Sequence, residues 1–311
     1  MITLQTTPGY GFQAQQSPSE REVGTQKTTD TKGSELSVNP SSLADDSVSI
    51  SDTALLAASN KTQYYEQALP TYEGFSATNI AAGVSNPGVD TFSAGKTFDQ
   101  VATAARASMD NNYERLGNIG KPYNANTAQS IDRNSVIGEL DRRALYAVAS
   151  NEGDLFSKDE QSYARSKMSQ QTTLAMGMYR GPTSEKDKFI APLSHDHAPM
   201  FKAGIQFLDQ ASNEEKAGSI EFAHLRAGLQ RSYEVVVHEQ GGTPEDLSTD
   251  HPLVTLLLDA MRAAEGDLQR GQTFGPIEDL NDLKRQPWLE GLSDSLDSAV
   301  QSTGGMYLRG A

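Results

Sequence analysis

The sequence predicts an all-α fold behind a long, disordered, polar N-terminal segment. From residue 97 onward apolar residues recur at helical spacing, and no stretch alternates as a strand would. The apolar fraction is 36%, below the roughly 45–50% usual for globular domains, and the shortfall lies in residues 1–95. We therefore expect a Ser/Thr/Gln-rich leader over residues 1–95 and an all-α domain over 96–311, with a subdivision near 181–200.

Residues 139–168 predict the helical hairpin around which the domain is organised. Charged side chains at 141–143 are expected to face away from the apolar stripe of the first helix. Ser157 and Glu160 form an S-x-x-E capping box that begins the second helix, which is expected to continue towards Gly181. The stripe of the first helix consists of Ile137, Leu140, Ala144, Leu145 and Val148.

Cap and stop signals delimit the other predicted helices. Capping-box patterns occur at Thr97–Gln100 and at Ser212–Glu215. The second pattern predicts one long helix that ends at Gly241. Pro244 follows in a turn and suits a first helical position, and Pro252 opens the most apolar helix of the chain.

The loop of the hairpin resembles a degenerate EF-hand. With Glu160 at the bidentate last position, Ser157 falls at the ninth position and Asn151 at the third, and Phe156 takes the hydrophobic eighth. The resemblance covers residues 139–168 and implies calcium ligands at Asn151, Ser157 and Glu160.

Two positions depart from the EF-hand pattern. Ala149 stands where the first carboxylate ligand is expected, and Asp154 stands where the turn glycine is expected. A helix–loop–helix held by its capping box alone is therefore the competing interpretation.

The five histidines lie between His195 and His251, which raises a second metal hypothesis. His195 and His197 form an H-x-H pair of the kind that ligates zinc. His224 and His238 are fourteen positions apart, or about 21 Å along a helix, and are expected to be solvated. A third ligand would come from Glu221, His224, His238, Glu239 or His251.

Composition excludes several classes of function. The formal charge of −15 and the absence of a basic run exclude nucleic acid as a partner. No apolar run is long enough for membrane insertion, and the lack of cysteine excludes disulfides and thiolate metal sites. Catalytic sequence motifs are absent, and acidic pairs such as Glu214-Glu215 are expected to be solvated surface.

The polar, cysteine-free leader resembles the N-termini of bacterial flagellar and type III export substrates. Residues 46–54, DSVSISDTA, are similar to the start of the binding region of the flagellar anti-sigma factor. The start of the chain lacks the basic and apolar regions of a Sec signal. We therefore expect a cytoplasmic protein or one exported without a cleaved Sec signal.

These observations favour a non-enzymatic bacterial secreted or regulatory protein that acts through contacts with a protein partner. One alternative is a metal-dependent enzyme that uses His195 and His197 with zinc. The other is a calcium-responsive helix–loop–helix module at Asn151, Ser157 and Glu160. The main hypothesis requires no cofactor.

Overall fold

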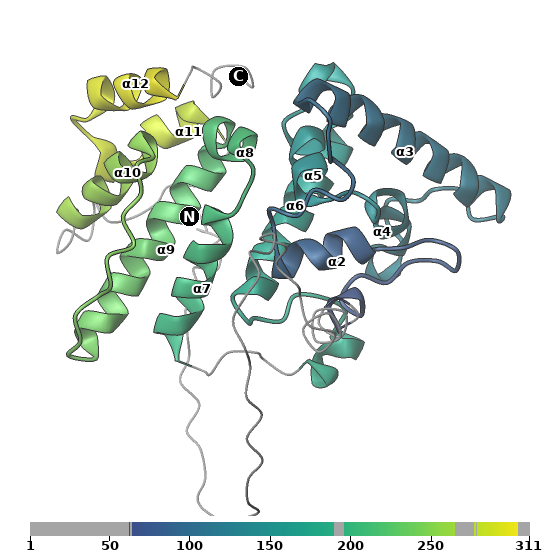
Figure 1. Ribbon diagram of the computed structural model, residues 1–311, viewed down its shortest axis with the longest axis horizontal. Helices are drawn as coiled ribbons and strands as arrows, with labels where there is room; N and C mark the ends of the chain where they lie inside the picture. Colours follow the sequence, from purple (N-terminus) through teal and green to yellow (C-terminus); the bar gives the residue numbers. More distant parts are fainter. Residues whose placement is uncertain (1–61, 63, 190–195, 265–276, 278, 304–311) are drawn as a thin grey trace, which may run out of the picture. The chain divides into compact units, whose positions relative to one another are not determined.

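The computed structural model describes residues 62, 64–189, 196–264, 277 and 279–303, all of which lie in one compact unit, Ile50–Ala311. In this part of the chain helices are joined by turns and loops and no strand occurs, so the predicted all-α class is confirmed (Figure 1). None of the described helices combines the length and the apolar character needed to cross a membrane. The labels used below are those of Figure 1.

The first half of the unit contains α2 to α6, and the second half contains α7 to α12. The first group is α2 (Thr78–Ser85), α3 (Phe98–Asn118), α4 (Ile131–Ile137), α5 (Arg142–Ala149) and α6 (Lys158–Ala175). The second is α7 (His197–Asp209), α8 (Asn213–Gly218), α9 (Ile220–Glu239), α10 (Pro252–Ala263), α11 (Leu280–Lys284) and α12 (Ser293–Ser302). The described 3-10 helices are η1 (Ala128–Ser130), η2 (Glu152–Asp154), η3 (Thr183–Lys188) and η4 (Pro287–Leu289).

The first hydrophobic core begins well before residue 96, so the predicted boundary of the leader is wrong. Tyr65, Leu69, Ile80 and Val84 are all buried in a core that continues to Leu174. The reason is that α2 packs against α6, which buries the few apolar residues of a segment that is polar overall. Residues 1–61, which include the predicted export-like features, lie outside the described residues.

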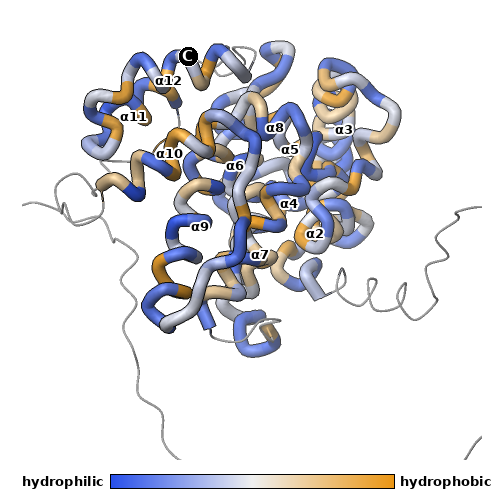
Figure 2. The backbone as a smooth tube through the Cα atoms, turned by 60° about the vertical axis from the view of Figure 1, so that its left-hand side comes forward, coloured by the Kyte–Doolittle hydropathy of each residue, from blue (hydrophilic) through white to orange (hydrophobic). Residues whose placement is uncertain are grey.

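The second hydrophobic core starts at Met176 and continues to Val300. The change from one core to the other thus falls at the end of α6, slightly before the predicted subdivision at 181–200. In the second core α9 packs against both α7 and α10. Figure 2 shows hydrophobic and hydrophilic residues alternating along these helices, as expected for amphipathic helices with one buried face.

Both predicted capping boxes at the starts of α3 and α6 are confirmed. The Thr97 side chain accepts the Gln100 amide while the Gln100 side chain accepts the Thr97 amide. Ser157 and Glu160 make the same reciprocal pair. These bonds satisfy backbone N–H groups that the first turn of a helix leaves without intrahelical partners.

The first helix of the predicted hairpin is broken, contrary to expectation. Helix α4 ends at Ile137, and α5 begins at Arg142 after an N-cap at Asp141. At the break, Gly138 lies so close to the Ser76 carbonyl that a Cβ there would be 2.0 Å from the Ser76 oxygen. Both Asp141 and Arg142 are buried, so the expectation that they face away from the core is wrong.

The long helix predicted from Ser212 is also broken. Ser212 caps only the short α8, and Ser219, whose backbone is extended, ends α8 and caps α9. The Glu215 side chain does not complete a capping box, because it is bonded to Arg142 instead. Residues 243–250 are non-helical, so Pro244 does not open a helix, whereas Pro252 does open α10 as predicted.

Candidate functional site: the groove between α9 and α10

A solvent-open groove of about 460 Å³ lies between α9, the extended connection 243–251 and α10. We call it the α9–α10 groove. Apolar side chains of the connection and of α10 form part of its lining, and polar side chains form the rest. The lining residues are Gln230, Glu234, His238, Pro244, Glu245, Asp246, Leu247, Ser248, Thr249, Val254, Thr255, Leu258 and Arg262.

One polar face of α9 contributes Gln230, Glu234 and His238 to the lining of this groove. Arg226, Gln230, Glu234 and His238 follow one another at four-residue intervals, which places them on one face of the helix. Consecutive hydrogen bonds join the first three: Arg226 Nη1 donates to Gln230 Oε1 at 2.8 Å, and Gln230 Nε2 donates to Glu234 Oε1 at 3.2 Å. We call these four residues the α9 ladder.

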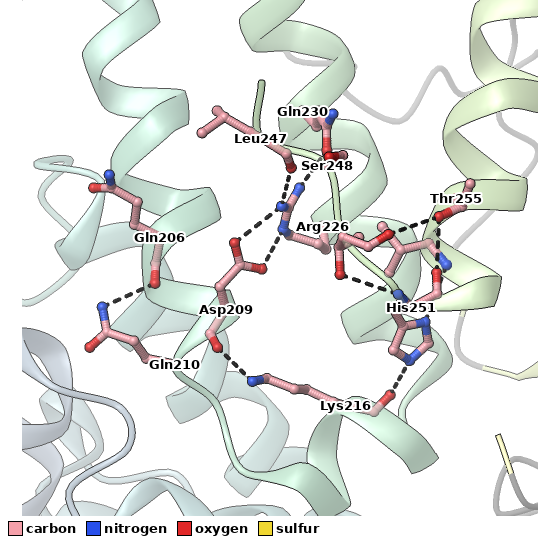
Figure 3. A network of polar contacts seen from close by, with 12 residues as sticks. Gln206, Asp209, Gln210, Lys216, Arg226, Gln230, Leu247, Ser248, His251 and Thr255 are labelled. Atoms are coloured by element: carbon pink, nitrogen blue, oxygen red, sulfur yellow. Dashed lines mark hydrogen bonds and ion pairs between the residues drawn. The ribbon is translucent and has the colours of Figure 1, made fainter. Parts of the chain in front are cut away.

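Arg226 anchors the ladder to its surroundings (Figure 3). Its side chain is 1% exposed, so its charge needs partners to offset the cost of desolvation. Nε and Nη2 donate to the two carboxylate oxygens of Asp209 at 2.7 and 3.1 Å. Nη2 also donates to the Leu247 carbonyl at 2.8 Å, so Arg226 holds the connection 243–251 against α9.

Two further contacts fix the same wall of the groove. The Glu245 amide donates to the Tyr233 hydroxyl at 3.3 Å, and the Glu245 carboxylate accepts Lys202 at 2.6 Å. The Asp246 carboxylate accepts the Ser248 amide at 3.0 Å, and hydrogen bonding from the Ser248 side chain and amide lowers the pKa of Asp246. A non-helical segment of this length is thereby tied to both α7 and α9.

His251 joins the connection to α10 (Figure 3). Its Nδ1 accepts the Val254 amide at 3.3 Å as the N-cap of the helix, and its Nε2 lies 2.8 Å from the Lys216 carbonyl. These partners select the neutral tautomer that carries its proton on Nε2. Burial lowers the pKa of His251, although its bond to the Lys216 carbonyl partly opposes this effect.

The rim of the groove carries an excess of negative charge. Glu234 accepts Arg262 Nη2 and Nε at 2.6 and 3.0 Å, and this bond raises the pKa of Arg262. Of the three lining carboxylates, Glu234 is paired with Arg262 and Glu245 with Lys202, which leaves Asp246 without a cationic partner among the described residues and one negative charge in excess. The groove therefore favours a cationic group over an anionic one.

No protein-family profile, curated protein or solved structure matches this chain. What the groove does must therefore be inferred from its own geometry and charge. Of the described residues that the sequence predicts as metal ligands, His238, a candidate third zinc ligand, is the one that lines the groove.

The predicted zinc pair is only partly within the described residues. His197 is the exposed first residue of α7, and its ring lies 6.3 Å from that of Phe201. His195 is outside the described residues. Within the described ranges no three His, Asp or Glu side chains are grouped so that they could hold a metal ion.

The predicted calcium ligands do lie together, but their oxygens already accept hydrogen bonds from protein groups. Glu160 Oε2 accepts the Ser157 amide at 2.8 Å, and its Oε1 accepts Arg106 at 2.9 Å and the Tyr113 hydroxyl at 3.0 Å. Burial raises the pKa of Glu160, but the bonds from Ser157 and Arg106 outweigh it and lower the pKa overall. The side-chain oxygen of Asn151 accepts a backbone amide, that of Phe156, at 2.8 Å.

The expectation that His224 is solvated is wrong. Its ring stacks on Trp288 with centroids 6.0 Å apart, and burial lowers its pKa. His238 is exposed, as expected, but it lines the α9–α10 groove. The sequence signal that was missed is the spacing of four polar residues along α9, which indicates a continuous polar face.

Proposed function

We propose that the chain is a non-enzymatic protein that acts through protein–protein contacts, and that the α9–α10 groove receives a positively charged segment of the partner. The observation that carries the proposal is an open groove with a net negative rim, bounded by a connection that hydrogen bonds hold in place. A preorganised wall favours binding because little ordering entropy is lost on association.

The groove suits an extended peptide segment of the partner better than an enclosed small molecule. Apolar contact is offered by Leu247, Val254 and Leu258, while the rim offers carboxylates and hydroxyls along its length. Apolar contact of this kind supplies affinity, and the rim charges supply selectivity and a faster encounter. A lysine or arginine in the segment would lie near Glu245 and Asp246.

Site-specific photo-cross-linking tests this proposal. A benzoylphenylalanine is placed at His238, which is exposed and lines the groove, or at Glu114, an exposed residue of α3 remote from the lining. The probes are a lysine-rich and a glutamate-rich peptide of equal length. We expect adducts at position 238 with the lysine-rich peptide only, and a loss of yield as salt screens the rim. Equal yields at positions 238 and 114 would overturn the proposal.

Glu245→Lys and Asp246→Lys supply the matching charge reversals. Each should reduce the yield at position 238 with the lysine-rich peptide, while Glu114→Lys should leave it unchanged. Because Glu245 and Asp246 are exposed, these changes should leave the helices folded. Each removes one side-chain contact of the connection 243–251, to Lys202 or to Ser248, but the bonds to Arg226 and Tyr233 still hold the connection.

The proposal that the chain is exported rests on its leader, and the structure indicates where to cut for a test. Residues 65–92 contribute to the first core, so the informative truncation removes residues 1–61 and leaves the described helices whole. Secretion that continues unchanged without residues 1–61 would contradict the export proposal.

A further inference from the structure

Two cationic side chains lie over the ring of one tyrosine of α6, and a third cationic residue, Arg180, is linked to them through Gln170. Lys167 Nζ and Arg133 Cζ each lie 5.0 Å from the centroid of the Tyr163 ring. Arg180 follows α6, and its carbonyl accepts Gln170 Nε2 at 2.6 Å, while Gln170 Oε1 accepts Lys167 Nζ at 2.8 Å. We call Arg133, Lys167 and Arg180 the cation cluster.

The cation cluster has no carboxylate partner among the described residues. Arg180 donates to the Ser169 hydroxyl at 2.6 Å, Lys167 donates to an amide oxygen, and no ion pair joins Arg133 to a described residue. The chain has 41 acidic residues against 26 lysines and arginines. Buried arginines elsewhere in the described helices, such as Arg142 and Arg226, are paired with carboxylates, whereas the buried Lys167 has only an amide oxygen.

The cluster extends from solvent into the interior. Arg180 is exposed, Arg133 is half-buried, and Lys167 is only 6% exposed. An ammonium group has three donors, and Gln170 is the one described acceptor for that of Lys167. Burial, together with the nearby charges of Arg180 and Arg133, lowers the pKa of Lys167 to about 7.

The side chains around the cluster are held in position. The Tyr163 hydroxyl donates to Asn134 Oδ1 at 2.6 Å, and Asn134 Nδ2 donates to the Pro70 carbonyl at 2.8 Å. Gln170 Nε2 also donates to the Ala68 carbonyl at 3.2 Å. These bonds hold the side chains around Lys167 in place, and the charges of Arg180 and Arg133 act on Lys167 strongly enough to lower its pKa. A bound anion would relieve this repulsion.

We propose that Arg133, Lys167 and Arg180 form a binding site for a small oxyanion, a phosphate or a carboxylate group. The guanidinium groups of Arg133 and Arg180 supply paired donors that match the geometry of such groups. Lys167 supplies a point charge at the inner end of the site. The site is separate from the α9–α10 groove, so it can be tested independently of the proposed function.

The test measures thermal unfolding and titration calorimetry of the full chain with inorganic phosphate or with acetate, against sodium chloride at equal ionic strength. The expected result is a saturable rise in melting temperature and measurable heat with one of the two anions, because a ligand that binds the folded state stabilises it. Whichever anion binds identifies the chemical class. The absence of saturable binding by both would overturn the proposal.

Variants locate the binding. Arg133→Gln and Lys167→Met should each weaken anion binding about tenfold or more, the loss expected for one charge-assisted hydrogen bond. Lys158→Gln is the matched control, since Lys158 is an exposed residue of the same helix. Undiminished binding by Arg133→Gln, which keeps every hydrogen bond of the cluster described above, would overturn the proposal even if Lys167→Met failed to fold.

Discussion

Arg142 donates hydrogen bonds to both carboxylate oxygens of Glu215, from Nε to Oε2 at 2.9 Å and from Nη2 to Oε1 at 2.7 Å. Both side chains are 3% exposed. The remaining donor of Arg142, Nη1, is bonded to the Met168 carbonyl and to Gln171 at 3.1 Å each. Since Arg142 belongs to α5 and Glu215 to α8, this pair joins the helices of the first core to those of the second.

Breaking this pair should be strongly destabilising. Glu215→Gln leaves the Arg142 charge buried without a counter-charge, and we expect a loss of about 3–5 kcal/mol in the free energy of unfolding. Denaturant unfolding followed by circular dichroism measures it. The double variant Arg142→Met/Glu215→Leu should lose less than Glu215→Gln, because no charge then remains buried.

The neighbouring pair supplies the control. Arg143 and Glu214 approach to 2.6 Å, but their side chains are 19% and 26% exposed. Glu214→Gln should therefore cost no more than about 1 kcal/mol. If Glu214→Gln and Glu215→Gln had equal effects, burial would not be the cause of the stabilisation.

Replacing Asp141 should destabilise the fold almost as much as replacing Glu215. Its carboxylate is 0% exposed and accepts the Phe92 and Ser93 amides at 2.9 and 2.8 Å, the Ser93 hydroxyl at 2.7 Å and the Ala144 amide at 2.9 Å. Asp141→Ala removes a helix cap and leaves buried donors unsatisfied, so we expect a loss of about 3 kcal/mol. In the same denaturation assay Asp159→Ala, at an exposed site in the first turn of α6, should change stability by less than about 1 kcal/mol.

Truncation should separate the leader from the folded unit. Removing residues 1–61 should leave helical content and cooperative thermal unfolding intact, since it deletes none of the described core residues. Removing residues 1–95 deletes Tyr65, Leu69, Ile80 and Val84, each of which is buried. That truncation should lose the cooperative transition of the first core. A cooperative 96–311 fragment would contradict the structure.

Stability should fall in mild acid, partly through His251. Its pKa is lowered in the folded state, so as pH falls below the ordinary value near 6.5 the unfolded chain binds this proton first. The stabilisation is thus present above that value and is lost as pH falls through the lowered pKa. His251→Asn retains a helix cap without titrating. Melting curves from pH 7 to 5 should therefore decline less for the variant than for the wild type; parallel curves would exclude His251 as the cause.

Millimolar calcium should leave the melting temperature unchanged. The Glu160 carboxylate already accepts Arg106, Tyr113 and Ser157, so a cation would have to displace these donors. Glu160→Gln, which disturbs the capping box, should cost about 1 kcal/mol. A calcium-specific rise in melting temperature that magnesium does not reproduce, and that Glu160→Gln abolishes, would support the EF-hand-like interpretation instead.

The sequence predicted the start of a helix correctly where a capping box marks that start. The boxes at Thr97 and Ser157 are formed by neighbouring residues alone, so their geometry follows from spacing. The breaks at Asp141 and Ser219 were missed because tertiary contacts create them. Asp141 is tied to Ser93, and no pattern within ten residues of Asp141 reveals that partner.

The groove could not be predicted from the sequence, because it too depends on tertiary contacts. Its wall depends on Arg226 reaching the Leu247 carbonyl, a contact across 21 positions that has no sequence signature. Acidic residues such as Glu215 were expected at the surface because most are, and burial beside an arginine reversed that expectation. Only the four-residue spacing of the α9 ladder was visible in advance.

The α9 ladder also constrains how this protein can change over generations. Replacing Arg226 removes a hydrogen-bond donor from both Asp209 and Gln230. Replacing Gln230 removes a hydrogen bond from both Arg226 and Glu234. A single substitution therefore costs more than a coordinated pair. In divergent relatives, substitutions at the positions of the α9 ladder should occur together in matched combinations. Rim residues that do not belong to the ladder should be substituted independently of one another.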